Sequence, residues 1–556
     1  MEALDWLVIG VFFLALIGII VWVVRQKQND SADYFLGGRD ATWLAIGASI
    51  FASNIGSEHL IGLAGAGASS GMAMAHWEIQ GWMILILGWV FVPFYTRSMV
   101  YTMPEFLERR YNPQSRTILS VISLVSYVLT KVAVTVYAGG LVFQQVFGIK
   151  ELWGIDFFWI AAIGLVVLTA LYTIFGGMKS VLYTSVLQTP ILLLGSLIIL
   201  VLGFKELGGW DEMMRVCGAV TVNDYGDTMT NLIRSNDDAN FPWLGALIGS
   251  AIIGFWYWCT DQFIVQRVLS GKNEMEARRG TIFGAYLKLL PVFLFLIPGM
   301  IAFALHQKYI GAGGEGFLPM LENGTANADA AFPTLVAKLL PAGVKGLVVC
   351  GILAALMSSL ASLFNSSAML FTIDFYKRFR PQTSEKKLVG IGQVATVVIV
   401  ILGILWIPIM RSVGDVLYTY LQDVQSVLAP GIAAAFLLGI CWKRTSAQGG
   451  MWGLISGMVI GLTRLGAKVY YSNAGEVADS TFKYLFYDMN WLFFCGWMFL
   501  FCIIVVIVVS LATEAPTAEK IQGLVFGTAT KEQKASTRAS WNHWDIIHTV
   551  IILAIT

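Results

Sequence analysis

The residues best suited to binding chemistry form the stretch 52–59, Ala-Ser-Asn-Ile-Gly-Ser-Glu-His. It places a glycine, small polar side chains, an acid and a histidine inside a hydrophobic segment long enough to cross a bilayer. Every backbone polar group in hydrocarbon needs a partner, so such a break persists only where it lines a cavity or binds a ligand. The stretch therefore predicts an interrupted helix at a binding site.

A second unusual segment, Phe-Trp-Tyr-Trp-Cys-Thr-Asp-Gln at 255–262, combines aromatic and polar side chains inside another apolar run. An aromatic ring such as Tyr257 can stack on the C–H face of a sugar. A mostly apolar pocket with few polar contacts suits a small polyhydroxylated solute. The polar side chains available for hydrogen bonds to hydroxyls within such segments are His59, Glu78, Lys288 and Gln422.

Structural roles remain open for most of these residues. Glu78 and Lys288 also suit snorkelling, in which the charged end of the side chain reaches the membrane interface. His59 suits a hydrogen bond between helices, and Tyr257, flanked by two tryptophans, suits aromatic packing. Lys131, also within an apolar run, is expected to pair with a neighbouring carbonyl or acid.

The pair Ser358 and Ser359 lies in a run of small residues, a pattern that most often indicates close helix packing. Hydroxyls facing the unwound carbonyls near 52–55 would instead complete an all-oxygen site for a hard monovalent cation. Na⁺ fits that arrangement better than a proton, because a proton needs a titrating side chain. Glu58, beside the histidine, is assigned no role.

These residues must be positioned by membrane-spanning helices. The chain of 556 residues is 57% hydrophobic and 13% charged, whereas soluble domains carry roughly a quarter charged residues. No P-loop, metal-ligand cluster or nucleophile with its base is present in the sequence, so we expect no enzyme. Fourteen apolar runs suit spans, the last of them short, near 4–24, 43–68, 74–95, 117–147, 157–175, 181–203, 242–269, 280–304, 342–373, 386–409, 414–441, 447–467, 490–512 and 545–556.

The distribution of charge predicts the orientation. If the N-terminus lies outside, the predicted cytoplasmic loops hold 23 of the 36 Lys and Arg residues, as the positive-inside rule requires. The two unusual segments lie in the first and sixth spans after the leading helix, and interrupted helices of inverted-repeat transporters occupy such corresponding positions. We therefore expect a multi-pass protein of the cell (inner or plasma) membrane, with both termini extracellular or periplasmic.

The motifs resemble the sodium:solute symporter family, specifically its sodium–glucose branch. The resemblance runs in matching order from about residue 5 to 512. It rests on Asp-Tyr-Phe-Leu-Gly-Gly-Arg at 33–39, the stretch 52–59, Leu-Tyr-Thr-Ile-Phe-Gly-Gly-Met at 171–178, Trp-Tyr-Trp-Cys-Thr-Asp-Gln-Phe-Ile-Val-Gln-Arg at 256–267, and Leu-Met-Ser-Ser-Leu-Ala-Ser-Leu-Phe-Asn-Ser at 356–366.

The resemblance implies an all-α integral membrane fold with a LeuT-type core of five-plus-five inverted helices. One leading and three trailing helices would bring the total to fourteen transmembrane helices. The implied parts are a leading transmembrane helix at 1–30, a first inverted repeat at 43–203, a second at 242–441, and trailing helices at 447–556.

The resemblance also implies site residues. His59, Glu78, Lys288 and Gln422 would bind the sugar through hydrogen bonds, with Tyr257 as an inner gate beneath it. Trp258 would neighbour that gate, and Trp77 would occupy another wall position. The implied sodium ligands are the carbonyls of Ala52, Ile55 and Ala355 and the hydroxyls of Ser358 and Ser359.

Three departures from the family pattern affect the prediction. Gly254 stands where the bacterial sodium–galactose carrier has an asparagine in its site, so one contact is missing. Ser185 replaces the aspartate usual in relatives, and Ala361 replaces the threonine of animal carriers that couple two sodium ions. Both latter changes remove oxygen ligands or charge expected of a second sodium site. We therefore predict one Na⁺ per sugar.

The function predicted from the sequence is a symporter that couples Na⁺ entry to uptake of a hexose such as glucose or galactose by alternating access. Its partners would be the sugar, Na⁺ and the lipid bilayer, with neither nucleic acid nor an obligatory protein partner. The alternatives are an inositol or other polyol symporter, and a sugar-gated sensor or ion leak on the same fold. A sialic acid or proline carrier fits this residue set less well.

Overall fold

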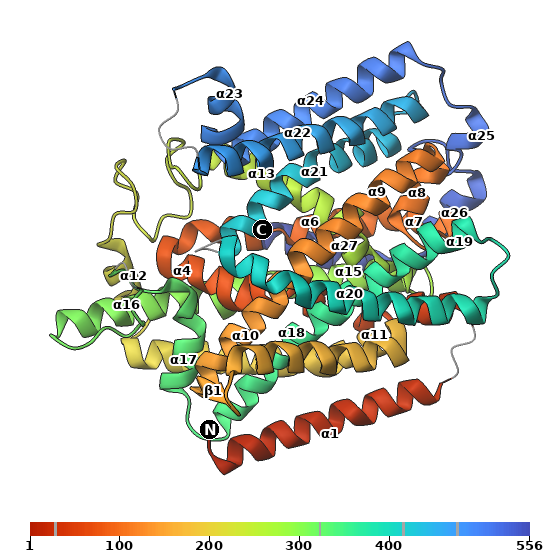
Figure 1. Cartoon of the computed structure of the whole chain (residues 1–556). Helices are drawn as coiled ribbons and strands as arrows, with labels where there is room; N and C mark the ends of the chain where they lie inside the picture. Colours follow the sequence, from red (N-terminus) through yellow and green to blue (C-terminus); the bar gives the residue numbers. More distant parts are fainter. Residues whose placement is uncertain (27–29, 322–323, 414–416, 474–477) are drawn as a thin grey trace.

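The computed structural model describes residues 1–26, 30–321, 324–413, 417–473 and 478–556 (Figure 1). This part of the chain is almost entirely helical, and its one small sheet pairs β1 (Glu151–Leu152) with antiparallel β2 (Ile155–Asp156). Within it, ten helices are long and apolar enough to cross a membrane. The predicted all-α membrane class is therefore confirmed, while the count of fourteen spans and the inverted repeat remain predictions.

The leading helix, α1 (Ala3–Arg25), packs against α11 (Phe157–Leu207) and α18 (Val344–Met369). Its outer surface is apolar and exposed, as expected of a helix that faces lipid. Asp5 is the exception, because its carboxylate is buried and accepts hydrogen bonds from the backbone N–H groups of Gly343 (2.7 Å) and Gly346 (2.8 Å). These contacts attach α1 to the start of α18.

The first predicted repeat and the segment just before it contain many short helical pieces. Those labelled η are 3-10 or π-helical. In chain order they are α2 (Ser31–Leu36), η1 (Gly37–Arg39), α3 (Trp43–Asn54), η2 (Glu58–Leu63), α4 (Ala64–Ser70), η3 (Gly71–Met74), α5 (Ala75–Glu78), α6 (Gly81–Ile86), η4 (Leu87–Phe91), α7 (Val92–Ser98), α8 (Met103–Arg110), α9 (Pro113–Ser126), η5 (Tyr127–Val132), α10 (Ala133–Phe147) and α11 (Phe157–Leu207).

The second predicted repeat begins after a loop that contains α12 (Trp210–Gly218). Its elements are α13 (Trp243–Phe255), η6 (Trp256–Thr260), α14 (Gln262–Leu269), α15 (Glu274–Lys288), η7 (Val292–Leu296), α16 (Ile297–Gly311), η8 (Ala328–Ala330), α17 (Ala331–Leu339), α18 (Val344–Met369), η9 (Leu370–Tyr376), α19 (Lys377–Phe379), α20 (Glu385–Val413) and α21 (Leu417–Cys441).

The trailing region packs on one side of this bundle, where α22 and α24 contact α21 (Figure 1). Its last helix, α27, contacts α6 and α15. The elements are α22 (Ala447–Asn473), α23 (Thr481–Lys483), η10 (Tyr484–Asp488), α24 (Trp491–Ala512), α25 (Ala518–Ile521), α26 (Lys531–Ala539) and α27 (His543–Ile555).

Helix α11 covers two of the spans predicted from hydropathy, 157–175 and 181–203, and they meet at a sharp kink. The kink lies at Gly177, whose φ of 53° is open to glycine but unfavourable for other residues. A Cβ placed there would lie 2.4 Å from the carbonyl oxygen of Tyr34. The Gly-Gly pair thus both turns the chain and lets α2 pack against it.

Candidate substrate cavity and ion site

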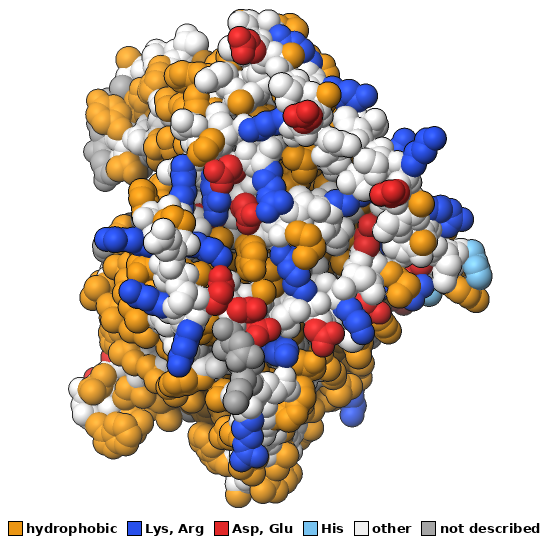
Figure 2. Space-filling view, turned by 90° about the vertical axis from the view of Figure 1, so that its right-hand side faces the viewer, with side chains coloured by type: hydrophobic (Ala, Val, Ile, Leu, Met, Phe, Trp, Pro, Cys, Tyr) orange, Lys and Arg blue, Asp and Glu red, His pale blue; other side chains and the backbone are white. Residues whose placement is uncertain are grey.

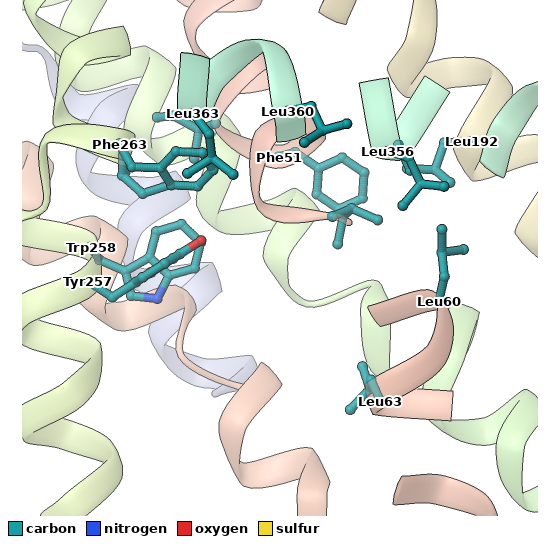
Figure 3. Close-up of a cluster of buried hydrophobic side chains, with 14 of the residues drawn as sticks. Phe51, Leu60, Leu63, Leu192, Tyr257, Trp258, Phe263, Leu356, Leu360 and Leu363 are labelled. Atoms are coloured by element: carbon teal, nitrogen blue, oxygen red, sulfur yellow. The ribbon is translucent and has the colours of Figure 1, made fainter. Parts of the chain in front are cut away.

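The first predicted break is present. Helix α3 ends at Asn54, and Ile55 is extended with ψ 108° before the chain resumes a π-helical course at Glu58. Helix ends leave their last carbonyl groups without partners in the same helix. Figure 3 shows Phe51 and Leu60 on either side of this break, with their side chains in the buried apolar cluster.

The second predicted break is centred on Asp261, which separates η6 from α14. Its carboxylate accepts a hydrogen bond from the Tyr127 hydroxyl and lies 2.8 Å from Lys131 Nζ. The expectation that Lys131 pairs with a neighbouring carbonyl or acid is therefore confirmed. The same ammonium lies 4.6 Å from the centroid of the Tyr257 ring, within cation–π distance.

A central cavity lies between these two breaks. It brings together His59, Glu78, Tyr257, Trp258 and Lys288, which are all of the predicted sugar-site residues whose side chains the structure describes. The predicted contact by Gln422 lies outside the described side chains. The full lining is Asn54, Glu58, His59, Trp77, Glu78, Gln80, Ile253, Gly254, Tyr257, Trp258, Lys288 and Gln425.

Glu78 and Lys288 form a buried ion pair across the cavity wall. Lys288 Nζ lies 2.5 Å from Glu78 Oε2. Lys288 is 4% exposed and Glu78 is 2% exposed. Snorkelling is therefore excluded for both in this structure, because neither charged end reaches the surface. A buried charge needs such a partner, and the pair leaves no net charge on this side of the cavity.

His59 extends the network. Its Nε2 lies 3.3 Å from Glu78 Oε2 and 3.4 Å from Asn54 Nδ2. Its Nδ1 is buried and has no hydrogen-bond partner among the described residues. The interhelical role considered for His59 is thus present. The unpartnered Nδ1 needs a further explanation, because buried polar groups are nearly always hydrogen-bonded.

The structure supplies an amide where the sequence indicated a missing contact. A Cβ placed on Gly254 would lie 2.5 Å from Gln80 Oε1, so the absence of a side chain there makes room for Gln80. Gln80 Nε2 donates to the Ser250 carbonyl (3.0 Å), which fixes its amide at the cavity wall. The signal was the position of Gln80 two residues after Glu78, in the same apolar run 74–95.

Gln425, Glu58 and Asn54 are further cavity residues that the sequence did not assign. Gln425 lies three residues after Gln422 on α21, and residues at this spacing share a helix face. That spacing was the available signal for Gln425. Asn54 and Glu58 flank the first break, but their orientation depends on how the chain unwinds there.

Tyr257 packs among aromatic rings and also lines the cavity, while its contact with a sugar remains a prediction. Its ring contacts Trp258 edge-on, with centroids 5.0 Å apart, and lies 6.3 Å from Phe263. It also lines the central cavity. Figure 3 shows Tyr257 and Trp258 together at one end of the buried cluster, close to Phe263 and Leu363.

The predicted sodium ligands lie where α18 passes the first break. A Cβ placed on Gly56 would lie 3.0 Å from Ser359 Oγ, so this glycine permits the close approach of the two segments. Ser358 Oγ lies 3.3 Å from Ser185 Oγ. Ser185 therefore keeps one oxygen beside the predicted ligands, although it lacks the charge of an aspartate. The ligand set itself remains a prediction.

Comparisons with known proteins agree with one another. The model of the sodium:solute symporter family matches residues 34–457. The chain is 36% identical over 542 residues to sodium/myo-inositol cotransporter 2 of Homo sapiens, covering 95% of this chain and 79% of that protein. It is 36% identical over 560 residues to sodium/glucose cotransporter 4 of Danio rerio, covering 97% and 84% respectively.

The fold also matches solved structures. A Na⁺-coupled sialic acid symporter in a substrate-bound outward-open state has a TM-score of 0.75 at 21% identity, covering 93% of this chain and 99% of that one. MhsT in complex with L-phenylalanine has a TM-score of 0.52 at 13% identity, covering 87% and 100%. At these identities the likeness shows a shared fold.

Proposed function

This chain belongs to the sodium:solute symporter family, and on that premise we propose that it couples entry of one Na⁺ to uptake of a hexose such as glucose or galactose. The observation that carries the proposal is the central cavity, whose lining combines a neutralised Glu78–Lys288 pair and His59 with the rings of Tyr257 and Trp258. Such a pair both donates to and accepts from hydroxyls, and the rings suit the apolar face of a sugar.

The charge of the cavity favours a neutral solute. Lys288 neutralises Glu78, whereas Glu58 has no ion-pair partner among the described residues, so the lining carries one net negative charge. A carboxylated sugar would be repelled by this charge in a low-dielectric site. The proposed substrate class is accordingly a neutral polyol or sugar rather than a sialic acid.

The proposed coupling uses one broken helix for two ligands. Carbonyls of Ala52 and Ile55, with the Ala355 carbonyl and the hydroxyls of Ser358 and Ser359, would hold Na⁺. His59, on the other side of the same break, would bind the sugar. Each ligand then favours the same arrangement of this segment, which is the reciprocal coupling that symport requires. Tyr257 would have to move before the sugar leaves inward.

One sodium ion provides enough free energy for useful accumulation. One charge crossing 100 mV contributes about 2.3 kcal/mol, and a tenfold Na⁺ gradient adds about 1.4 kcal/mol. Together these values correspond to a concentration ratio of a few hundredfold for a neutral sugar. A second ion would square that ratio.

A myo-inositol symporter is the second candidate. The observation that favours it is the similarity over nearly the whole chain to proteins named sodium/myo-inositol cotransporters, including the human protein. An inositol ring is a neutral polyol of the same chemical class as a hexose, so the same polar groups and aromatic rings suit it.

We further infer that both termini lie outside. Figure 2 shows the molecule from the end at which α19 and α25 lie in Figure 1. Many Lys and Arg side chains gather on this face. This end includes the loop around 377–387, with five basic residues. The positive-inside rule favours the cytoplasm for such a face.

The deciding experiment is uptake by the purified full chain in proteoliposomes, with Na⁺ or K⁺ outside, across glucose, galactose, myo-inositol and sialic acid. We expect Na⁺-dependent accumulation of a neutral sugar or polyol. Sugar-evoked current without accumulation of label would instead identify the sensor or ion leak. Accumulation of sialic acid would overturn the neutral class, and a reversal potential that indicates two Na⁺ per sugar would overturn the stoichiometry.

A further inference from the structure

A second cavity adjoins the central one along the first break. Asn54, Glu58 and Tyr257 line both cavities, whereas Ser359 and Lys131 line only the second. The second cavity therefore connects the surroundings of a predicted sodium ligand with the wall of the proposed sugar site. Its polar lining needs an explanation, because neither the sugar contacts nor the predicted sodium ligands include Glu58.

The charge in this second cavity is negative. Lys131 Nζ lies 2.8 Å from Asp261 Oδ2, so that ammonium is already neutralised by its own partner. Glu58 is partly exposed to the cavities and forms no ion pair or side-chain hydrogen bond with any residue that the structure describes. An uncompensated carboxylate within a membrane-spanning segment is costly and marks a functional site, often an ion pathway.

An orphan hydroxyl adjoins Glu58 in the same cavity. Ser57 is 1% exposed, and its Oγ has no hydrogen-bond partner among the described residues. With the Glu58 carboxylate and the Ser359 hydroxyl it gives an oxygen-rich lining. Hard cations take oxygen ligands, with carboxylates and neutral oxygens combined.

We propose that Glu58 and Ser57 form a transit site for Na⁺, which the ion occupies as it enters or leaves the oxygens around Ser359. The proposal rests on the proposed function, because it concerns the same ion. It keeps one Na⁺ per transport cycle, since the transit site and the predicted Ser358–Ser359 site hold the ion in turn. The Glu58 carboxylate lowers the energy of Na⁺ as the ion moves to and from the Ser358–Ser359 site, and so speeds the exchange of Na⁺.

A transit site should affect the rates of Na⁺ binding and release much more than the Na⁺ dissociation constant. In the sugar-free full chain, Na⁺ concentration jumps followed by stopped-flow tryptophan fluorescence would give association and dissociation rates, and ²²Na⁺ binding would give the equilibrium constant. Glu58→Gln is expected to slow both rates by at least about tenfold, because a unit charge near the path is lost. The dissociation constant of Na⁺ from the Glu58→Gln protein should change by only about threefold or less.

Glu58→Asp should largely restore the rates, and Ser57→Ala should slow them less than Glu58→Gln does. Ser367 is a buried serine on α18 whose hydroxyl also has no partner among the described residues. Ser367→Ala is therefore the matched control and should exchange Na⁺ normally. Saturable sugar binding at high Na⁺ checks that each variant is folded.

Unchanged exchange rates in a folded Glu58→Gln protein would overturn the transit site. The transit site would also be overturned if the wild-type chain bound two Na⁺ ions and the Glu58→Gln protein bound one, because Glu58 would then belong to a resident second site. A wild-type chain that binds no Na⁺ would instead overturn the proposed function itself. Normal Na⁺-driven uptake together with unaltered Glu58→Gln exchange would remove only the transit site.

Discussion

Lys288 Nζ lies 2.5 Å from Glu78 Oε2, and this contact joins α15 to α5 across 210 residues of sequence. Both side chains are buried, and the Lys288 ammonium also lies 5.4 Å from the centroid of the Trp258 ring. The ion pair thus links helices of the two predicted repeats at the wall of the central cavity.

Removing one member of this pair should be more damaging than removing both. Lys288→Met leaves a buried carboxylate without its ammonium, which typically costs about 3–5 kcal/mol. We expect a strong loss of thermal stability in Lys288→Met and partial recovery in Lys288→Met with Glu78→Gln, measured by thermal unfolding in detergent. Sugar uptake should be lost in both proteins. Equal stability of the single and double variants would contradict the energetic role of the pair.

The predicted sodium site can be tested at Ser359. Ser359→Ala should raise the half-saturating Na⁺ concentration of uptake by about tenfold or more, since polar contacts to a charge contribute roughly 1.5–3 kcal/mol. Its unfolding temperature should change little. Ser367→Ala, on the same helix, should keep wild-type Na⁺ activation, and wild-type activation in Ser359→Ala would exclude this hydroxyl as a ligand.

The place of Gln80 beside Gly254 gives a third prediction. Gly254→Ala puts a Cβ 2.5 Å from Gln80 Oε1, so the amide must leave the cavity wall. We expect the KM for sugar to rise roughly tenfold in uptake assays, the effect of losing one well-placed hydrogen bond. Gly164→Ala, where a Cβ meets nothing within 4 Å, is the control.

A compensating pair sharpens this test. Gly254→Asn with Gln80→Ala returns an amide to the wall from the other helix and removes the clash. It should transport better than Gly254→Asn alone. A double variant no better than the single one would show that Gln80 does not occupy the volume in question.

The loop between α16 and α17 gives a pH prediction. Burial raises the pKa of Asp329, in η8, to about 6, and its carboxylate packs against Gly65 of α4. Because ionisation is disfavoured in the folded state, this carboxyl lowers stability as pH rises from about 4 through 6, and the penalty is fully present above 6. Asp329→Asn should therefore raise the unfolding temperature at pH 7, with a difference that vanishes toward pH 4.

The exposed acid Asp237, in the loop before α13, is the control for this titration. Asp237→Asn should shift the unfolding temperature little at any pH between 4 and 7. If Asp329→Asn stabilises the protein equally at pH 4 and pH 7, its effect does not come from ionisation.

Much of the site could be predicted because its chemistry conflicts with its surroundings. A break in an apolar run at 52–59, polar groups at 255–262, and acids and bases such as Glu78 and Lys288 within spans are visible in any hydropathy pattern. Hydrocarbon penalises each of these features unless a cavity or partner accounts for it. The sequence by itself therefore determined the membrane class, the two breaks and five of the twelve residues that line the cavity.

Only the tertiary structure decided how these residues are paired. Lys288 meets Glu78, Lys131 meets Asp261, Gln80 fills the space beside Gly254, and Ser185 meets Ser358. Each contact depends on the rotation and depth of two helices that are far apart in the sequence, and hydropathy places a span only to within several residues. A rotation by one residue turns a helical side chain by about 100°, enough to move it from a cavity into lipid.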